Sequence, residues 1–279
     1  METPGTSDLH ADLPVPTTSA SPPKEPPFFR TKPATLLVRG GVVHTGRGGS
    51  GTRADVVVDD GFITWIGEVR ADQPADRTLD ATGLVVAPGF IDLHSHTDPE
   101  GSLNHLLAMG VTTIVLGQDG ESPKEGVAGF LRSYKRGAGV NVSTLAGHST
   151  LRKQALALEP NNAMRRRAHL AELVTSALAE GALGLSFGLE YDGARGTDQD
   201  ELLACLAPLG AEKRVAMAHL RSEDDEAIEG SISEFIGACK GAGAHAHIAH
   251  LKVVLGKGEA RAEEILNLLE KARDRKSVV

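Results

Sequence analysis

The sequence predicts an α/β protein in which a small β-rich domain precedes a parallel sheet, and two patterns carry this prediction. From Gly89 onward, short apolar runs alternate with amphipathic stretches of helical period, which is typical of parallel strands joined by right-handed crossovers. Residues 35–88 instead contain β-rich runs separated by Gly and Asp-Gly turn signals. We therefore expect a small antiparallel domain at 35–88 and a strand–helix domain at 89–279.

In the second domain we count six strand–helix units. The expected strands lie at residues 90–96, 111–116, 141–146, 183–189, 215–220 and 244–251. The expected helices include residues 164–178, 198–209 and 260–272. A closed (β/α)8 barrel has eight units. The pattern alone therefore leaves open an incomplete barrel and an open six-stranded sheet.

Composition limits the class of protein. Residues 1–34 hold more than half of the chain's 14 prolines, and we expect them to form a disordered tail. A net charge of −8 and an aromatic content of 4% argue against a nucleic-acid partner. Neither a signal peptide nor an apolar run long enough to span a membrane is evident. With only two cysteines, the sequence favours a soluble, cytoplasmic protein.

The last six residues, DRKSVV at 274–279, resemble the peptide encoded by a common sequencing adapter. We therefore expect the sequence to be a fragment of a longer gene.

Four histidines stand at the ends of expected strands. In APGFIDLHSHTD, residues 87–98, His94 and His96 share the parity of Asp92 and would share one face of a strand. His219 and His250 end two later strands and lie 31 positions apart, about one βα unit. Parallel strands end at a common rim, so the four imidazoles should converge there, as ligands of Zn²⁺ or a similar ion do.

Other residues near this rim are open to two interpretations. Asp119, in VLGQDGES, follows the second strand and is either a metal ligand or part of an Asp-Gly turn. His148 follows the third strand, where we expect it behind the ligands or in a loop. His245 and His247 have the opposite parity to His250, so we expect them to face the helices.

Taken together, these segments resemble the amidohydrolase superfamily, and within it the N-acyl-D-amino-acid deacylases, or D-aminoacylases. The likeness runs from about residue 34 to 273. GFIDLHSH indicates only the superfamily, whereas GALGLSFGLEY together with HLRSE and HLK points to the deacylases. The other matching segments are GVTTIVLGQDGESP and LAGHSTLR.

The resemblance implies an incomplete (β/α)8 TIM-like barrel that holds one or two Zn²⁺ ions. By motif, the metal ligands would be His94, His96, His219 and His250, with Asp119 where the best-studied deacylases carry a cysteine. Tyr191 and Lys252 match positions that hold the substrate's carboxylate. Arg221 would contact an anionic substrate or pair with Glu223. The family's catalytic Asp would lie beyond Val279, so we expect the chain as given to be inactive.

The implied reaction is hydrolysis of the amide bond of a small-molecule N-acyl-D-amino acid. The acyl group, the amino-acid side chain, the number of metal ions and the oligomeric state stay open. One alternative is a cyclic-amide hydrolase of the dihydroorotase or dihydropyrimidinase kind, but the run LGLSFGLEY lacks the strand-four lysine typical of those enzymes. The other alternative is a non-catalytic fragment with exposed strand edges.

Overall fold

The computed structural model describes residues 26–97 and 103–274, and the chain divides into two compact units between Pro88 and Gly89. The expected tail falls mostly on residues 1–25, which lie outside the described residues. Residues 26–34, however, belong to the first unit. The Phe28 ring stacks on Trp65 at 5.2 Å between centroids, and Ala34 is fully buried. The boundary expected at residue 34 is therefore wrong, because these apolar side chains have partners in the sheet.

The first unit is a five-stranded mixed sheet of order β3-β2-β1-β4, in which β5 also pairs with β1. The strands β1, β2 and β3 are antiparallel, whereas β4 and β5 run parallel to β1, so the expectation of a purely antiparallel domain is wrong. Asp60 and Gly61 join β2 to β3 with φ of 51° and 84°, as a tight hairpin requires. The strands are β1 (Leu36–Val43), β2 (Thr52–Asp59), β3 (Phe62–Gly67), β4 (Thr78–Asp80) and β5 (Val85–Val86).

The second unit contains parallel strands that follow one another in chain order. One sheet has the order β6-β7-β8 and the other β9-β10-β11-β12. The stretch 141–147 joins them, because β8 pairs with β7 while β9 pairs with β10. The strands are β6 (Phe90–Asp92), β7 (Val111–Leu116), β8 (Asn141–Thr144), β9 (Ala146–Gly147), β10 (Gly184–Gly188), β11 (Val215–His219) and β12 (His245–Ile248). This succession is that of six strand positions of a (β/α)8 barrel.

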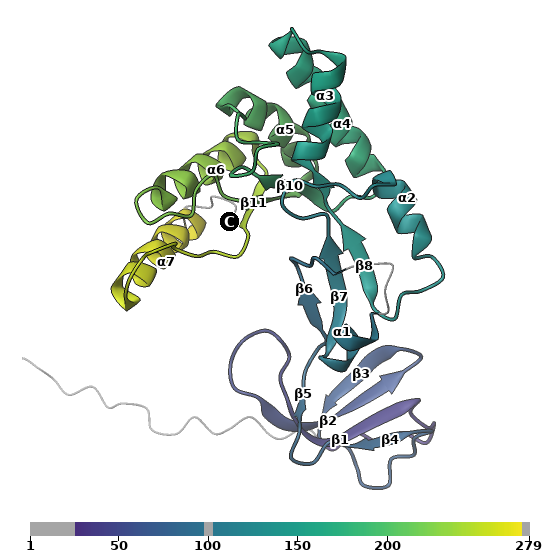
Figure 1. Ribbon diagram of the computed structural model, residues 1–279. Helices are drawn as coiled ribbons and strands as arrows, with labels where there is room; N and C mark the ends of the chain where they lie inside the picture. Colours follow the sequence, from purple (N-terminus) through teal and green to yellow (C-terminus); the bar gives the residue numbers. More distant parts are fainter. Residues whose placement is uncertain (1–25, 98–102, 275–279) are drawn as a thin grey trace, which may run out of the picture. The chain divides into compact units, whose positions relative to one another are not determined.

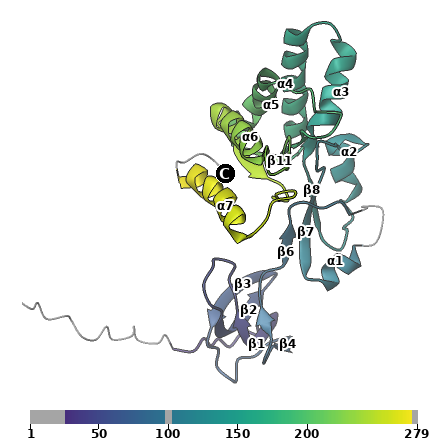
Figure 2. The ribbon, with the colours of Figure 1, turned by 60° about the vertical axis from the view of Figure 1, so that its left-hand side comes forward.

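All helices of the described residues belong to the second unit, and α3 to α6 pack successively against one another (Figures 1 and 2). Asp198 caps α5 by accepting a hydrogen bond from the Glu201 backbone N–H at 2.8 Å. No helix of the described residues is long and apolar enough to cross a membrane. The helices are α1 (Asn104–Ala108), α2 (Gly126–Ser133), α3 (His148–Leu158), α4 (Ala163–Ala179), α5 (Gln199–Glu212), α6 (Ile228–Ala242) and α7 (Glu259–Asp274).

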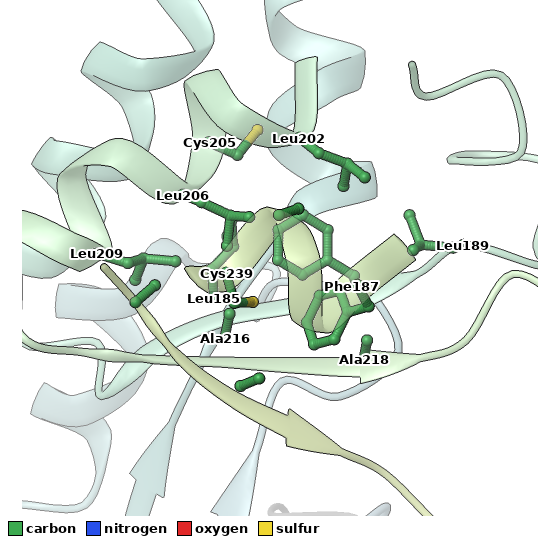
Figure 3. Close-up of a cluster of buried hydrophobic side chains, with 14 of the residues drawn as sticks. Leu185, Phe187, Leu189, Leu202, Cys205, Leu206, Leu209, Ala216, Ala218 and Cys239 are labelled. Carbon is green, nitrogen blue, oxygen red and sulfur yellow. The ribbon is translucent and has the colours of Figure 1, made fainter. Parts of the chain in front are cut away.

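The two faces of the strands have different neighbours. Leu185 and Phe187 of β10 lie in the main core with Leu202 and Leu206 of α5 (Figure 3). The opposite, inner face of the strands carries a smaller, inner cluster of Val115 and Met217, together with Leu145 between β8 and β9 and Ala249 just beyond β12. The strand β6 lies at an edge of the first of these sheets and β12 at an edge of the second. Among the described residues, each pairs with a single neighbouring strand.

Candidate metal centre

His94 and His96 do not lie on a strand, contrary to the expectation for residues 90–96. The strand β6 ends at Asp92, whose Oδ1 accepts a hydrogen bond from the His94 backbone N–H at 3.2 Å. Gln118 holds the same connection by donating from Nε2 to the Leu93 carbonyl oxygen at 2.8 Å. The two imidazoles still meet, because their Nε2 atoms lie 3.1 Å apart.

His219 and His250 form a second pair at the ends of neighbouring strands. His219 is the last residue of β11 and is buried, with 5% of its surface exposed. His250 lies two residues beyond the end of β12 and has a φ of 31°. This left-handed backbone turns its side chain towards the inner face, so that His250 Nε2 lies 3.0 Å from His219 Nδ1.

Asp119 lies between the two histidine pairs. Its Oδ2 is 3.1 Å from His96 Nε2 and 3.6 Å from His94 Nε2. Its Oδ1 is 3.8 Å from His250 Nε2 and 4.0 Å from His219 Nδ1. The turn interpretation of this residue also applies, since its φ is 56° and Gly120 follows with 87°. The left-handed turn is what aims the carboxylate at the histidines.

This donor set fits a divalent cation. In tetrahedral zinc, bonds of about 2.0–2.1 Å place neighbouring ligand atoms about 3.3 Å apart, close to the spacings of both histidine pairs. Asp119 Oδ1 is buried without a hydrogen-bond partner among the described residues, as a metal-binding oxygen would be. Burial lowers the pKa of His94, although the Asp119 charge opposes it, and the neutral imidazole is the form that ligates.

Two groups of side chains could each hold an ion, and they share His250. His94, Asp119 and His250 form one, and His219, Glu223 and His250 form the other, each with its ligand atoms within 4.8 Å of one another.

Glu190 and Glu223 are site residues that the sequence reasoning missed. Glu190 Oε2 lies 2.6 Å from His219 Nε2. Glu223 is buried and its Oε1 lies 2.9 Å from His250 Nδ1. Carboxylates in these positions fix the orientation of imidazoles that bind metal. A signal did exist, because Glu190 lies two residues beyond the end of β10 and Glu223 stands four residues after His219.

Tyr191 and Lys252 both lie at this site. The Tyr191 hydroxyl is 3.0 Å from His219 Nδ1, and 44% of the residue is exposed. Burial raises the pKa of Tyr191, and the neighbouring charges of Asp119, Glu190 and Glu223 raise it further. The Lys252 ammonium contacts the Glu223 carboxylate, and half of its side chain is exposed.

Arg221 has a different partner from the one expected. It pairs with Glu234 of α6 through Nε and Nη2, at 2.9 Å, and not with Glu223. Nη1 also donates to the Arg195 carbonyl oxygen and Nη2 to the Thr197 carbonyl oxygen, both at 3.0 Å. All three guanidinium nitrogens thus have partners, and contact of Arg221 with an anionic substrate stays a prediction.

Three further histidines complete the comparison with the sequence. His148 is the first residue of α3, is fully buried, and lies 3.3 Å from Glu201, behind the strand ends. The prediction that His245 and His247 face the helices is wrong. They pair in register with Val215 and Met217, whose side chains belong to the inner cluster, whereas Ala246 lies in the helix-facing core.

Comparison with known proteins finds deacylases among the relatives that this chain resembles. No protein-family model matches the chain. The chain is 31% identical to an N-acyl-D-glutamate deacylase of Alcaligenes xylosoxydans xylosoxydans, over 85% of this chain and 54% of the relative. It is 30% identical to a D-aminoacylase of the same organism, over 89% of this chain and 57% of the relative. The chain thus spans about half the length of the curated relatives it matches.

Solved structures agree with this result. An N-acyl-D-glutamate deacylase from Bordetella bronchiseptica, in complex with zinc and a phosphonate mimic of the tetrahedral intermediate, aligns with a TM-score of 0.78 at 27% identity. That alignment covers 88% of this chain and 57% of the other. A D-aminoacylase described as defining a novel subset of amidohydrolases aligns with a TM-score of 0.74 at 30% identity, over 87% of this chain and 56% of that one. Another study of D-aminoacylase describes a binuclear metal centre.

Proposed function

Because this chain is a homologue of the metal-dependent N-acyl-D-amino-acid deacylases of the amidohydrolase type, we propose that the protein hydrolyses the linear amide bond of N-acyl-D-amino acids. The observation that carries the proposal is the convergence of both histidine pairs on Asp119, because this is a donor set for zinc. The substrate would be a small molecule with a free carboxylate.

Five side chains would hold the metal: His94, His96, Asp119, His219 and His250. When bound, one or two Zn²⁺ ions supply an activated water and polarise the acyl carbonyl. Glu190 and Glu223 keep the rings of His219 and His250 aimed inward, through contacts of 2.6 Å and 2.9 Å.

Lys252 and Tyr191 would bind the substrate's α-carboxylate. An ammonium has three donors, so Lys252 can keep its contact with Glu223 and still bind a carboxylate. The Tyr191 hydroxyl is partly exposed beside His219, which places a second donor near the metal ligands. Holding the carboxylate at two points would align the amide for attack. The resemblance assigns the proton-transferring Asp to a position beyond Val279.

The alternative of a cyclic-amide hydrolase has less support. The strand β10, Gly184–Gly188, contains no lysine that could be carbamylated to bridge two metals. A D-hydantoinase structure aligns with a TM-score of 0.59 at only 18% identity, which shows a common fold and nothing further.

Zinc binding tests the site directly in the 279-residue chain. Isothermal titration should show that Asp119→Asn and His219→Gln each weaken Zn²⁺ binding by about tenfold or more. His169→Gln is the matched control, because His169 is a half-buried residue of α4 whose side chain pairs with Glu172 and with none of the candidate ligands among the described residues. Equal affinities in all four proteins would refute the metal centre.

Activity is tested with the product of the complete gene that contains these 279 residues. We expect it to release amine from N-acetyl-D-amino acids faster than from their L forms, and to lose this activity on treatment with a chelator. Hydrolysis of dihydroorotate or of a hydantoin instead of the linear amides would favour the cyclic-amide alternative.

A further inference from the structure

The loop of residues 190–197 brings two side chains to the candidate metal centre. It leaves the end of β10 and leads into α5. Glu190 Oε2 lies 2.6 Å from His219 Nε2, and the Tyr191 hydroxyl lies 3.0 Å from His219 Nδ1. The position of this loop therefore decides whether both groups reach His219.

Arg221 holds the far end of the loop. Its Nη1 donates to the Arg195 carbonyl oxygen and its Nη2 to the Thr197 carbonyl oxygen, both at 3.0 Å. The Glu234 carboxylate of α6 fixes the guanidinium by accepting from Nε and Nη2 at 2.9 Å. A planar, forked donor can serve a carboxylate and two carbonyls at once, which a lysine ammonium cannot do in the same geometry.

Arg152 of α3 holds the loop from another direction. Its Nε donates to Glu201 Oε1 at 2.6 Å, and its Nη1 donates to the Gly193 carbonyl oxygen at 3.3 Å. Glu201 is itself buried, with 3% of its surface exposed, and also accepts from the Thr197 hydroxyl at 3.5 Å. Three carbonyls between residues 193 and 197 thus accept hydrogen bonds from two guanidinium groups.

We propose that Arg152 and Arg221 are positioning residues that hold loop 190–197 so that Tyr191 and Glu190 meet His219. The loop also has internal hydrogen bonds: the Ala194 and Arg195 amides donate to the Tyr191 carbonyl oxygen at 2.9 Å and 2.8 Å, and the Thr197 amide donates to the Ala194 carbonyl oxygen at 2.9 Å. The Arg195 guanidinium donates to the Glu190 carbonyl oxygen at 3.1 Å and 3.2 Å. These bonds shape the loop but do not attach it to the rest of the unit, so contacts from outside the loop must help to offset the conformational entropy of holding it in place. The effect of this loop position on substrate binding rests on the proposed function. The hold of Arg152 and Arg221 on loop 190–197, called the clamp below, rests on the contacts alone.

The chain offers a matched control in Arg261 of α7. Like the two clamp arginines, Arg261 binds carboxylates of neighbouring segments, Asp225 and Glu229 at 2.6 Å. It contacts neither loop 190–197 nor any candidate metal ligand among the contacts of the described residues. A general effect of losing an arginine should therefore appear in Arg261→Lys as well.

Hydrogen–deuterium exchange of the metal-free chain tests the clamp without reference to any reaction. In Arg221→Lys and Arg152→Lys, the amides of residues 194, 195 and 197 should exchange about tenfold faster or more, while Arg261→Lys leaves them unchanged. Unchanged exchange in both clamp variants, or equal acceleration in Arg261→Lys, would overturn the proposal. Where Arg221→Lys fails to fold, Glu234→Gln replaces it, because this variant weakens the hold on the guanidinium and keeps Arg221.

A second readout concerns Tyr191 and uses the product of the complete gene, loaded with zinc. Tyr191→Phe should weaken binding of N-acetyl-D-methionine in the wild-type background but cause no further loss in the Arg221→Lys background. Equal losses in both backgrounds would show that Arg221 does not act through Tyr191 and would contradict the proposal. A wild-type protein that binds no N-acetyl-D-methionine would refute the proposed function, and the exchange experiment would then decide the clamp by itself.

Discussion

Lowering the pH should destabilise the second unit through His148. This residue is fully buried, and its ring stacks on Phe187 at 5.0 Å between centroids. Burial lowers the pKa of His148 below its usual 6.5, although the hydrogen bond to Glu201 opposes the shift. The unfolded chain therefore binds one more proton than the folded chain between these two pKa values. Stability is fully present above about pH 6.5 and is lost as the pH falls through the folded-state pKa.

The magnitude follows from proton linkage. One proton bound only by the unfolded chain changes the free energy of unfolding by up to about 1.4 kcal/mol per pH unit. A loss of up to that size for each pH unit below 6.5, until the folded-state pKa is reached, is a measurable part of the roughly 5–15 kcal/mol that stabilises a typical domain. Glu201 contributes in a separate window. Burial would raise its pKa, but His148 and Arg152 lower it overall below 4.5, so that contribution is lost only in stronger acid.

The assay is urea unfolding at several pH values in the presence of a chelator, followed by circular dichroism at 222 nm. This signal reports the second unit, because the helices of the described residues all lie there, whereas fluorescence of the single Trp65 reports the first unit. His148→Gln keeps a donor towards Glu201 but does not titrate. We expect the variant to have a pH dependence shallower by up to about 1.4 kcal/mol per unit below pH 6.5. Identical slopes in the two proteins would show that His148 is not the group responsible.

Three further changes have expected outcomes. Gly117→Ala should abolish tight zinc binding and lower the urea midpoint, because φ is 75° there and a Cβ would lie 2.3 Å from the Leu145 carbonyl oxygen. Gly258→Ala is the control, since its φ is 83° but no heavy atom lies within 4 Å of the added Cβ. It should lower the free energy of unfolding by only about 1–2 kcal/mol. Asp198→Ala removes the cap of α5 and should lower the free energy of unfolding by about 1 kcal/mol, measured by the same urea titration. Phe187→Ala empties a fully buried position and should cost about 3–5 kcal/mol, so a loss below 1 kcal/mol would contradict the packing seen here.

The regular elements could be predicted because their signals are local. The strand expected at 111–116 coincides with β7, and the helix expected at 260–272 lies within α7, Glu259–Asp274. Strand and helix periods appear directly in the order of apolar residues. The α/β fold class agrees with the solved structures of the deacylases as well.

The errors arise where the backbone departs from a regular period. The prediction for His245 and His247 assumed that the strand continues to His250, but β12 ends at Ile248. The left-handed backbone of His250 then turns its side chain to the inner face, so its position in the sequence no longer shows which face His245 and His247 take. The strand also ends earlier than expected before His94, which lies beyond β6 and still meets His96 in the candidate metal centre.

Long-range ion pairs are the other part that the sequence could not reveal. Arg221 pairs with Glu234, 13 residues away on α6, although Glu223 is only two residues away in the chain. The choice depends on where α6 packs in the folded chain, which no local pattern encodes. Glu223 is consequently available to contact His250.

Among the described residues, the strands β6 and β12 are each hydrogen-bonded on one flank only, which has a practical consequence for the experiments on the 279-residue chain. Phe90 and Ile91 on β6 are more than half exposed, so apolar surface accompanies an open row of amides and carbonyls. Such a border can template the addition of a strand from another molecule. Light scattering should therefore rise with protein concentration, and charged substitutions at these two side chains should suppress that rise.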